Sequence, residues 1–155
     1  MMSQEIEPNI KPLCDALNRI ESVRTRYSCQ GHFWRGLPPY VSFEADTDVA
    51  AELEKELRAD SISYSRKLRT LWEVAGYFDG EFRLCFELSA PSYHKRTGER
   101  FCSLFTEKAL KPEFNALTEM VEIVHQRILV EKEMTERLLG RRPEIPEQKE
   151  TNDDA

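Results

Sequence analysis

Cys29, Gly31 and His32 form a short motif whose residue types and spacing could do chemistry. A thiol and an imidazole lie three residues apart in Cys29-Gln30-Gly31-His32. At that spacing the two side chains can meet across a tight turn, and Gly31 allows a ligand or another backbone to approach closely. The pair could act as a nucleophile with its base, as two zinc ligands, or as contacts to a bound molecule.

A purely structural interpretation of this motif is equally simple. Cys29 would be a small buried hydrophobe, Gly31 would serve the turn, and His32 would hydrogen-bond a backbone carbonyl. Among the functional interpretations, ligand contact is favoured over covalent catalysis because no acidic partner for His32 can be assigned. Zinc is the least favoured, since a second pair of ligands would be needed and His94 and Cys102 are poorly spaced for one. The sequence therefore predicts no metal site.

Around this motif the chain resembles the wybutosine-synthesis tRNA methyltransferase family. The resemblance lies in Leu17-Asn18, Thr25 and Ser28-Cys29-Gln30-Gly31-His32, within about twenty residues of the 155. Members of that family carry a helix, a strand and a Ser-Cys-Ser-Gly-Arg turn, so Gln30 and His32 stand where they have serine and arginine. The resemblance implies an α+β scaffold with Ser28, Cys29 and Gly31 on the turn. It also implies S-adenosylmethionine as cofactor and a modified guanosine in tRNA as substrate. The residues by themselves leave the cofactor unknown.

Aromatic residues directly follow the motif. Trp34 and Arg35, next to Phe33, could stack on a base or on another flat ligand. Alternatively, the two aromatic rings fold back onto the core as a lid. We predict six ligand-binding residues, namely Ser28, Cys29, Gly31, His32, Trp34 and Arg35.

Two basic segments are candidates for anion binding. One is the loop with His94, Lys95 and Arg96, and the other is the cluster Arg66, Lys67 and Arg69 before the third strand. Either could hold a phosphate, because guanidinium and ammonium groups donate several hydrogen bonds to such an anion. Runs of charge are more often solvated loops, and His94, Lys95 and Arg96 are the residues that we predict as the anion site.

Hydrophobic spacing and turn residues predict the elements that position these groups. The predicted order is α-β-β-α-β-β-α, which favours an α+β domain with a four-stranded, mainly antiparallel sheet and helices packed on one face. Apolar spacing is clearest in the first helix, at Ile10, Leu13, Cys14, Leu17 and Ile20. The predicted helices cover residues 9–21, 47–59 and 112–139, and the predicted strands cover 23–28, 40–45, 68–78 and 81–89.

The dipeptide Asp79-Gly80 between apolar runs predicts a two-residue hairpin turn of type I′. The two strands would then pair so that Glu73, Ala75 and Tyr77 lie beside Leu84 and Phe86 on the core face. The opposite face would carry Trp72, Arg83, Cys85 and Glu87. It could line a cleft, form a dimer interface, or be covered by another helix.

The last predicted helix is longer than the sheet is wide. Roughly 28 residues would span about 42 Å, whereas four strands span about 15–20 Å. Met134 and Leu138 on its apolar stripe would therefore extend past the sheet. They would need a cover, either the N-terminal segment or a second subunit, so this helix is also a predicted dimer surface.

Composition bounds the protein class. With 155 residues, 40% hydrophobic and 32% charged, the chain suits one globular domain, predicted over residues 1–142. Residues 143–155, with five acidic residues and one basic, are predicted to be a disordered acidic tail. The net charge of −6 argues against a global polyanion binder. The lack of a long apolar run or a signal peptide predicts a cytoplasmic protein with reduced cysteines and no membrane contact.

Two functions remain open from the sequence. The first is a domain that binds a small molecule or nucleotide at the Cys-x-Gly-His loop, with enzymatic activity undecided. The second is a non-catalytic interaction or regulatory module acting through the long last helix and the open sheet face. RNA binding through Trp34 and the basic loops is a weaker third. A glycine-rich phosphate loop and a nucleophile elbow are absent from the sequence, which disfavours most standard enzymes.

Overall fold

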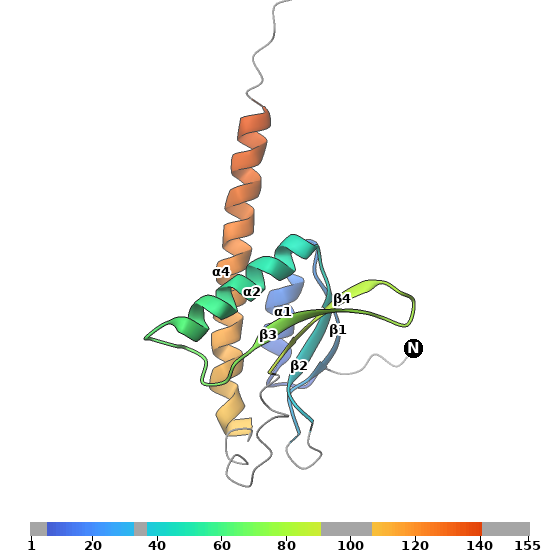
Figure 1. Ribbon diagram of the computed structural model, residues 1–155, viewed down its shortest axis with the longest axis vertical. Helices are drawn as coiled ribbons and strands as arrows, with labels where there is room; N and C mark the ends of the chain where they lie inside the picture. Colours follow the sequence, from blue (N-terminus) through green and yellow to red (C-terminus); the bar gives the residue numbers. More distant parts are fainter. Residues whose placement is uncertain (1–5, 33–36, 91–106, 141–155) are drawn as a thin grey trace, which may run out of the picture.

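The computed structural model describes residues 6–32, 37–90 and 107–140, and these form an α+β domain (Figure 1). The predicted order α-β-β-α-β-β-α is confirmed. The four strands form one antiparallel sheet in the order β1-β2-β4-β3. Figure 1 shows the helices on one side of this sheet. The elements are α1 (Lys11–Asn18), β1 (Arg24–Cys29), β2 (Tyr40–Glu44), α2 (Thr47–Ile62), β3 (Glu73–Phe78), β4 (Leu84–Ser89) and α4 (Glu107–Leu139).

The core lies between the sheet and the three helices. The apolar stripe predicted for the first helix is fully buried, which confirms the helical spacing of those residues. Along β2, Val41 and Phe43 face the helices and Ser42 faces the other side, as expected from the two-residue period of a strand. The core side chains include Ile10, Leu13, Leu17, Val41, Phe43, Leu53, Phe86, Leu88, Phe114, Leu117, Val121 and Val124.

The start predicted for the last helix was wrong. Pro112 was expected at its first turn, but α4 already begins at Glu107 and Pro112 lies inside it. Pro112 is the sixth residue of α4, just past the first four, whose N–H groups lack an intrahelical partner, so it removes a single backbone hydrogen bond close to the helix start. The next residue, Glu113, is buried and accepts hydrogen bonds from the segment that precedes β3.

The hairpin turn is longer than the sequence predicted. Phe78 pairs with Leu84, and the Asp79 N–H donates a 3.0 Å hydrogen bond to the Arg83 carbonyl. Three residues, Gly80 to Phe82, therefore form the loop tip. The Asp79 carboxylate accepts hydrogen bonds from the N–H groups of Glu81, at 2.9 Å, and Arg83, at 3.0 Å. Phe82 takes a positive φ of 60°. This combination is the three-residue hairpin loop that ends in a left-handed residue.

Because of the longer loop, the face of β3 that packs on the core is the opposite of the predicted one. The pairing moves by an odd number of residues, and each such shift exchanges the two faces of a strand. Val74, which pairs with Leu88, packs on the core, whereas Tyr77 lies on the open face and its hydroxyl is 2.5 Å from Ser42 Oγ. The predicted core face of β3 was therefore wrong, and that of β4 was correct.

Trp72 also does not lie on the open sheet face. It precedes the first paired residue of β3 and is 3% exposed. Its ring packs edge-on against Phe114 of α4, with ring centres 6.2 Å apart. Cys85 and Glu87 do lie on the open face, beside Tyr77 and Ser42, as the alternation along β4 requires.

The free end of α4 extends past the rest of the domain (Figure 1). Met134 is 58% exposed and Leu138 is 71% exposed, which confirms that both side chains extend beyond the sheet. In the described ranges, no helix is long and apolar enough to cross a membrane.

Candidate functional site

The Cys29–His32 turn begins at the last residue of β1. The backbones of His32 and Leu37 exchange two hydrogen bonds, of 2.9 and 3.2 Å, which close the loop between β1 and β2. Gly31 has φ +89°, a conformation that L side chains rarely adopt. A Cβ there would lie 3.2 Å from Pro39 Cδ and 3.3 Å from Leu110 Cδ1. The backbone conformation therefore strains any residue other than glycine, and a Cβ would also make tight contacts with its neighbours.

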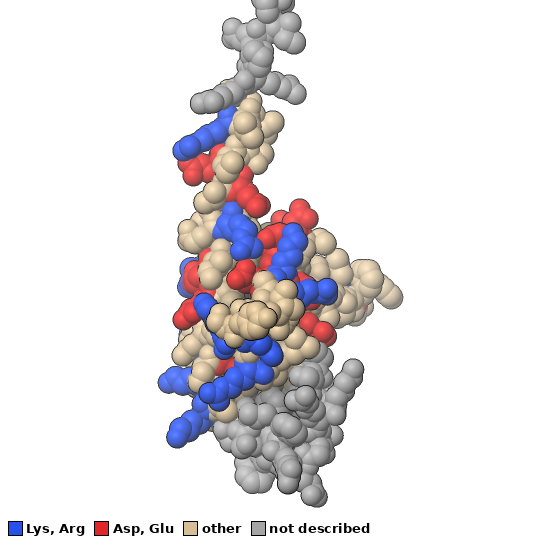
Figure 2. Space-filling view, turned by 60° about the vertical axis from the view of Figure 1, so that its left-hand side comes forward, with Lys and Arg blue, Asp and Glu red and all other residues tan. Residues whose placement is uncertain are grey.

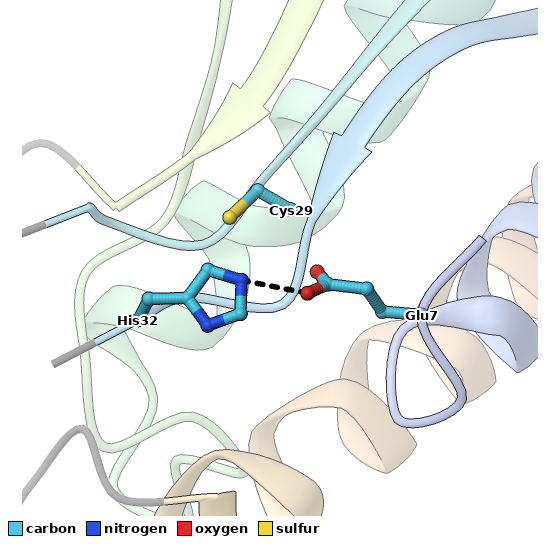
Figure 3. A group of neighbouring side chains, drawn as sticks. All are labelled: Glu7, Cys29 and His32. Atoms are coloured by element: carbon cyan, nitrogen blue, oxygen red, sulfur yellow. Dashed lines mark ion pairs between the residues drawn. The ribbon is translucent and has the colours of Figure 1, made fainter. Parts of the chain in front are cut away.

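Glu7, in the segment before α1, holds this turn in place (Figure 3). The sequence by itself did not suggest this residue. Its Oε1 lies 2.6 Å from His32 Nε2, and its Oε2 accepts a 2.7 Å hydrogen bond from the Gln30 N–H. The Gln30 side chain in turn accepts a 3.2 Å hydrogen bond from the Asn9 N–H. The carboxylate is therefore oriented by the backbone of the turn and by the imidazole together.

Cys29 completes a cluster of three different donor groups. Its sulfur is buried and accepts a 3.4 Å hydrogen bond from the Gly31 N–H. Burial raises the pKa of the Cys29 thiol, the Gly31 N–H lowers it, and the Glu7 charge raises it. The balance is a raised pKa, so the thiol is protonated near neutral pH.

The donor atoms of Glu7, Cys29 and His32 all lie within 4.8 Å of one another. Cys29 and His32 thus come together across the turn, as their spacing in the sequence allows. The His32 side chain is 40% exposed, so the site can be reached from solvent.

The geometry does not arrange Cys29 and His32 as a nucleophile and its base. His32 Nε2 is engaged by Glu7, and the other ring nitrogen lies on the side of the ring away from the sulfur (Figure 3). A general base needs a nitrogen within hydrogen-bond reach of the proton that it removes. The raised thiol pKa also disfavours a reactive thiolate. Three donor atoms that converge on one point are better suited to binding a ligand than to covalent catalysis.

Ser28, predicted as a ligand contact, is not brought into this cluster. It pairs with core-facing Val41 and hydrogen-bonds the thiol of Cys14 on α1, so its side chain lies on the helix side of the sheet. Asn18 and Thr25, which carry part of the family resemblance, hold α1 to β1. The Asn18 amide donates to Thr25 Oγ1 at 2.8 Å and accepts from the Thr25 N–H at 2.9 Å.

The other predicted site residues divide into two groups. Trp34, Arg35, His94, Lys95 and Arg96 lie outside the described residues. In the basic segment before β3, Lys67 pairs with Glu119 at 3.2 Å. Figure 2 shows basic and acidic side chains intermixed over the upper and middle parts of the face turned towards the viewer, whereas basic side chains predominate towards its lower end. An ion pair between exposed side chains, such as that of Lys67, is typical of a solvated surface.

A second cluster of donor atoms lies on the open sheet face. The donor atoms of Glu44, Asp79 and Cys85 are also within 4.8 Å of one another. Here, however, the guanidinium groups of Arg26 and Arg83 already pair with both carboxylates, with Arg83 3.0 Å from Asp79. Hydrogen bonds from the Arg83 backbone lower the pKa of Asp79, and further donors at Glu81 and Arg83 lower it as well. This cluster is a satisfied ion-pair network.

Comparisons of the chain with protein-family models, with curated proteins and with solved structures gave no match.

Proposed function

We propose that this domain binds a small molecule or nucleotide at the Cys29–His32 turn, with Glu7, Cys29 and His32 as the contact groups. The observation that carries the proposal is the 2.6 Å contact between Glu7 and His32, which brings a third donor to a turn that already holds two. Loops held by a rigid scaffold carry binding sites more often than the scaffold does.

The contact groups are held in place by neighbouring atoms and can be reached from solvent. The Gln30 N–H and His32 hold the two oxygens of Glu7, and the positive φ of Gly31 sets the path of the turn. The side chains of Glu7 and His32 are 28% and 40% exposed, so a ligand can reach them without unfolding the turn. Such preorganisation lowers the entropic cost of binding.

The first ligands to test are S-adenosylmethionine and guanosine 5′-monophosphate, which the family resemblance suggests. Either is expected to shift the amide NMR signals of Gln30, Gly31 and His32 when titrated into labelled protein. Changing Glu7→Gln together with His32→Ala should weaken binding by about 10–100-fold, since each removes a charged hydrogen bond. Glu119→Gln, an exposed change on α4, is the matched control and should leave the affinity unchanged. Absence of shifts at the turn with both compounds would contradict the proposal.

We also propose a second candidate function, binding of a protein partner through the free end of α4. Its exposed apolar side chains cannot be buried by the sheet, which ends below them. A groove of about 500 Å³ at the base of this segment is lined by Ile20, Val49 and Ile128, among others. The exposed apolar residues of α4 beyond this groove are Val130, Met134, Leu138 and Leu139. Contiguous apolar patches of this kind are typical of interaction sites.

If the partner is a second copy, Met134→Asp with Leu138→Asp should shift the protein from dimer to monomer without unfolding it. Neither side chain is buried in the single domain, so the change removes no folding contact. Light scattering and a thermal melt on the same samples measure both effects. Thr135→Asp, an equally exposed but polar position on α4, is the control. A wild-type protein that is monomeric at high concentration would exclude the dimer.

A further inference from the structure

We propose that Glu7, Cys29 and His32 bind a divalent transition metal ion of the zinc class, with one coordination position left for the ligand. This inference rests on the proposed function, because it uses the same turn, and it names the chemistry by which that turn would hold its ligand. It assigns a metal site where the sequence predicted none. Glu7 makes a metal site possible, because it supplies the third donor atom that the Cys-x-Gly-His motif lacks.

The three donors are those that zinc takes in proteins, namely a cysteine sulfur, a histidine nitrogen and a carboxylate oxygen. Sulfur and imidazole favour zinc and its neighbours over magnesium or calcium, which prefer oxygen alone. Three protein ligands with an open fourth position are the arrangement of zinc sites that bind a water or a substrate, whereas purely structural sites have four. A thiolate and a carboxylate would together neutralise the charge of the ion.

The distances require small movements. Zinc lies about 2.0–2.3 Å from its ligands, so the donors of a tetrahedral site are about 3.3–3.7 Å apart. The three donor atoms here are already within 4.8 Å of one another. The 2.6 Å contact between His32 Nε2 and Glu7 Oε1 would open as the ion takes the place of the proton between them. Rotation of the partly exposed side chains of Glu7 and His32 would bring about this change.

Backbone groups around the site hold the donors in the orientation that binding needs. Glu7 Oε2 is fixed by the Gln30 N–H, which leaves Oε1 for the ion. The Gly31 N–H points at the sulfur and would stabilise a thiolate. The other ring nitrogen of His32 points away from the cluster (Figure 3), so Nε2 is the nitrogen that faces the other two donors. Such outer contacts orient metal ligands and are worth about 10–100-fold in affinity.

The cluster of Glu44, Asp79 and Cys85 provides an internal contrast. It places a cysteine and two carboxylates, without a histidine, within the same separation. Arg26 and Arg83 already supply the positive charge there and would repel a cation. Among the described ion pairs, Glu7 has no lysine or arginine partner and pairs with His32. The two clusters therefore make opposite predictions for the same ion.

Cobalt(II) alone, added to chelator-treated full-length protein, tests the site directly. Sulfur coordination is expected to produce a charge-transfer absorption in the near ultraviolet, and Cys29→Ser should abolish it. Zinc titration calorimetry should give one site, weakened at least about tenfold by Glu7→Gln and by His32→Ala, because even outer-shell changes reach that size. Cys85→Ser is the matched control and should leave the absorption and the zinc affinity unchanged.

An absorption that survives Cys29→Ser, or that disappears in Cys85→Ser, would overturn the inference, as would zinc binding that is absent in the wild type. If Cys29→Ser fails to fold by thermal melt, Glu7→Gln and His32→Ala decide the question. Repeating the S-adenosylmethionine and guanosine monophosphate titrations on metal-free protein separates the two proposals. Binding of either compound without zinc binding would uphold the proposed function and overturn the metal site. Zinc binding at the cluster without either compound would do the reverse.

Discussion

Replacing Glu113 by alanine is expected to lower the free energy of unfolding by about 3 kcal/mol or more. The Glu113 carboxylate is 4% exposed and accepts three hydrogen bonds from the segment before β3. The donors are the N–H of Arg69 at 2.7 Å, the N–H of Thr70 at 3.2 Å and the indole N–H of Trp72 at 3.1 Å. Alanine would leave these three N–H donors without their acceptor. The buried indole N–H could not form a hydrogen bond to water instead.

Chemical denaturation followed by circular dichroism measures this effect. Glu119→Ala is the matched control, because Glu119 lies on the same helix but its side chain is 66% exposed in a single ion pair. That change should cost less than about 1 kcal/mol, the usual worth of a surface pair. Equal losses for Glu113→Ala and Glu119→Ala would show that the buried carboxylate does not anchor the segment.

Replacing Phe43 by alanine is expected to lower the free energy of unfolding by about 3–5 kcal/mol. Phe43 is fully buried in β2, beneath the helices, and its ring centre lies 6.0 Å from that of Phe86 on β4. Truncation removes a large apolar side chain and leaves a cavity that the rigid sheet cannot close.

The control for this prediction is Phe78→Ala in β3. The Phe78 ring is 69% exposed near the hairpin tip, so its loss should change stability by about 0.5 kcal/mol or less. The same denaturation measurement compares the two variants. A small loss for Phe43→Ala, or a comparable loss for Phe78→Ala, would contradict the packing of the sheet against the helices.

Local signals in the sequence were sufficient for the order of elements and for much of the core. The apolar spacing in the first helix and the alternation of Val41 and Phe43 around Ser42 depend only on helix and strand periods. Those periods act within a few residues of the chain. Burial of these side chains in the structure follows from them directly.

The hairpin shows where a local signal was incomplete. Asp79-Gly80 correctly marked a turn, but the dipeptide does not specify the loop length. The Asp79 side chain binds the N–H groups of Glu81 and Arg83, which favours the longer loop with Phe82 at positive φ. A short polar side chain thereby decided which face of β3 is buried.

The candidate site shows most clearly which features depend on the sequence alone and which depend on the tertiary structure. The sequence by itself determined that a thiol and an imidazole share one glycine-bearing turn, because their spacing is local. Only the tertiary structure decided that Glu7 joins them and that Ser28 faces Cys14 on α1. Glu7 lies in a polar segment without periodicity, and its contacts with Gln30 and His32 form only when α1 packs against β1 and carries that segment to the sheet end. Such a contact depends on the packing of elements far apart in the chain, which no spacing of neighbouring residues encodes.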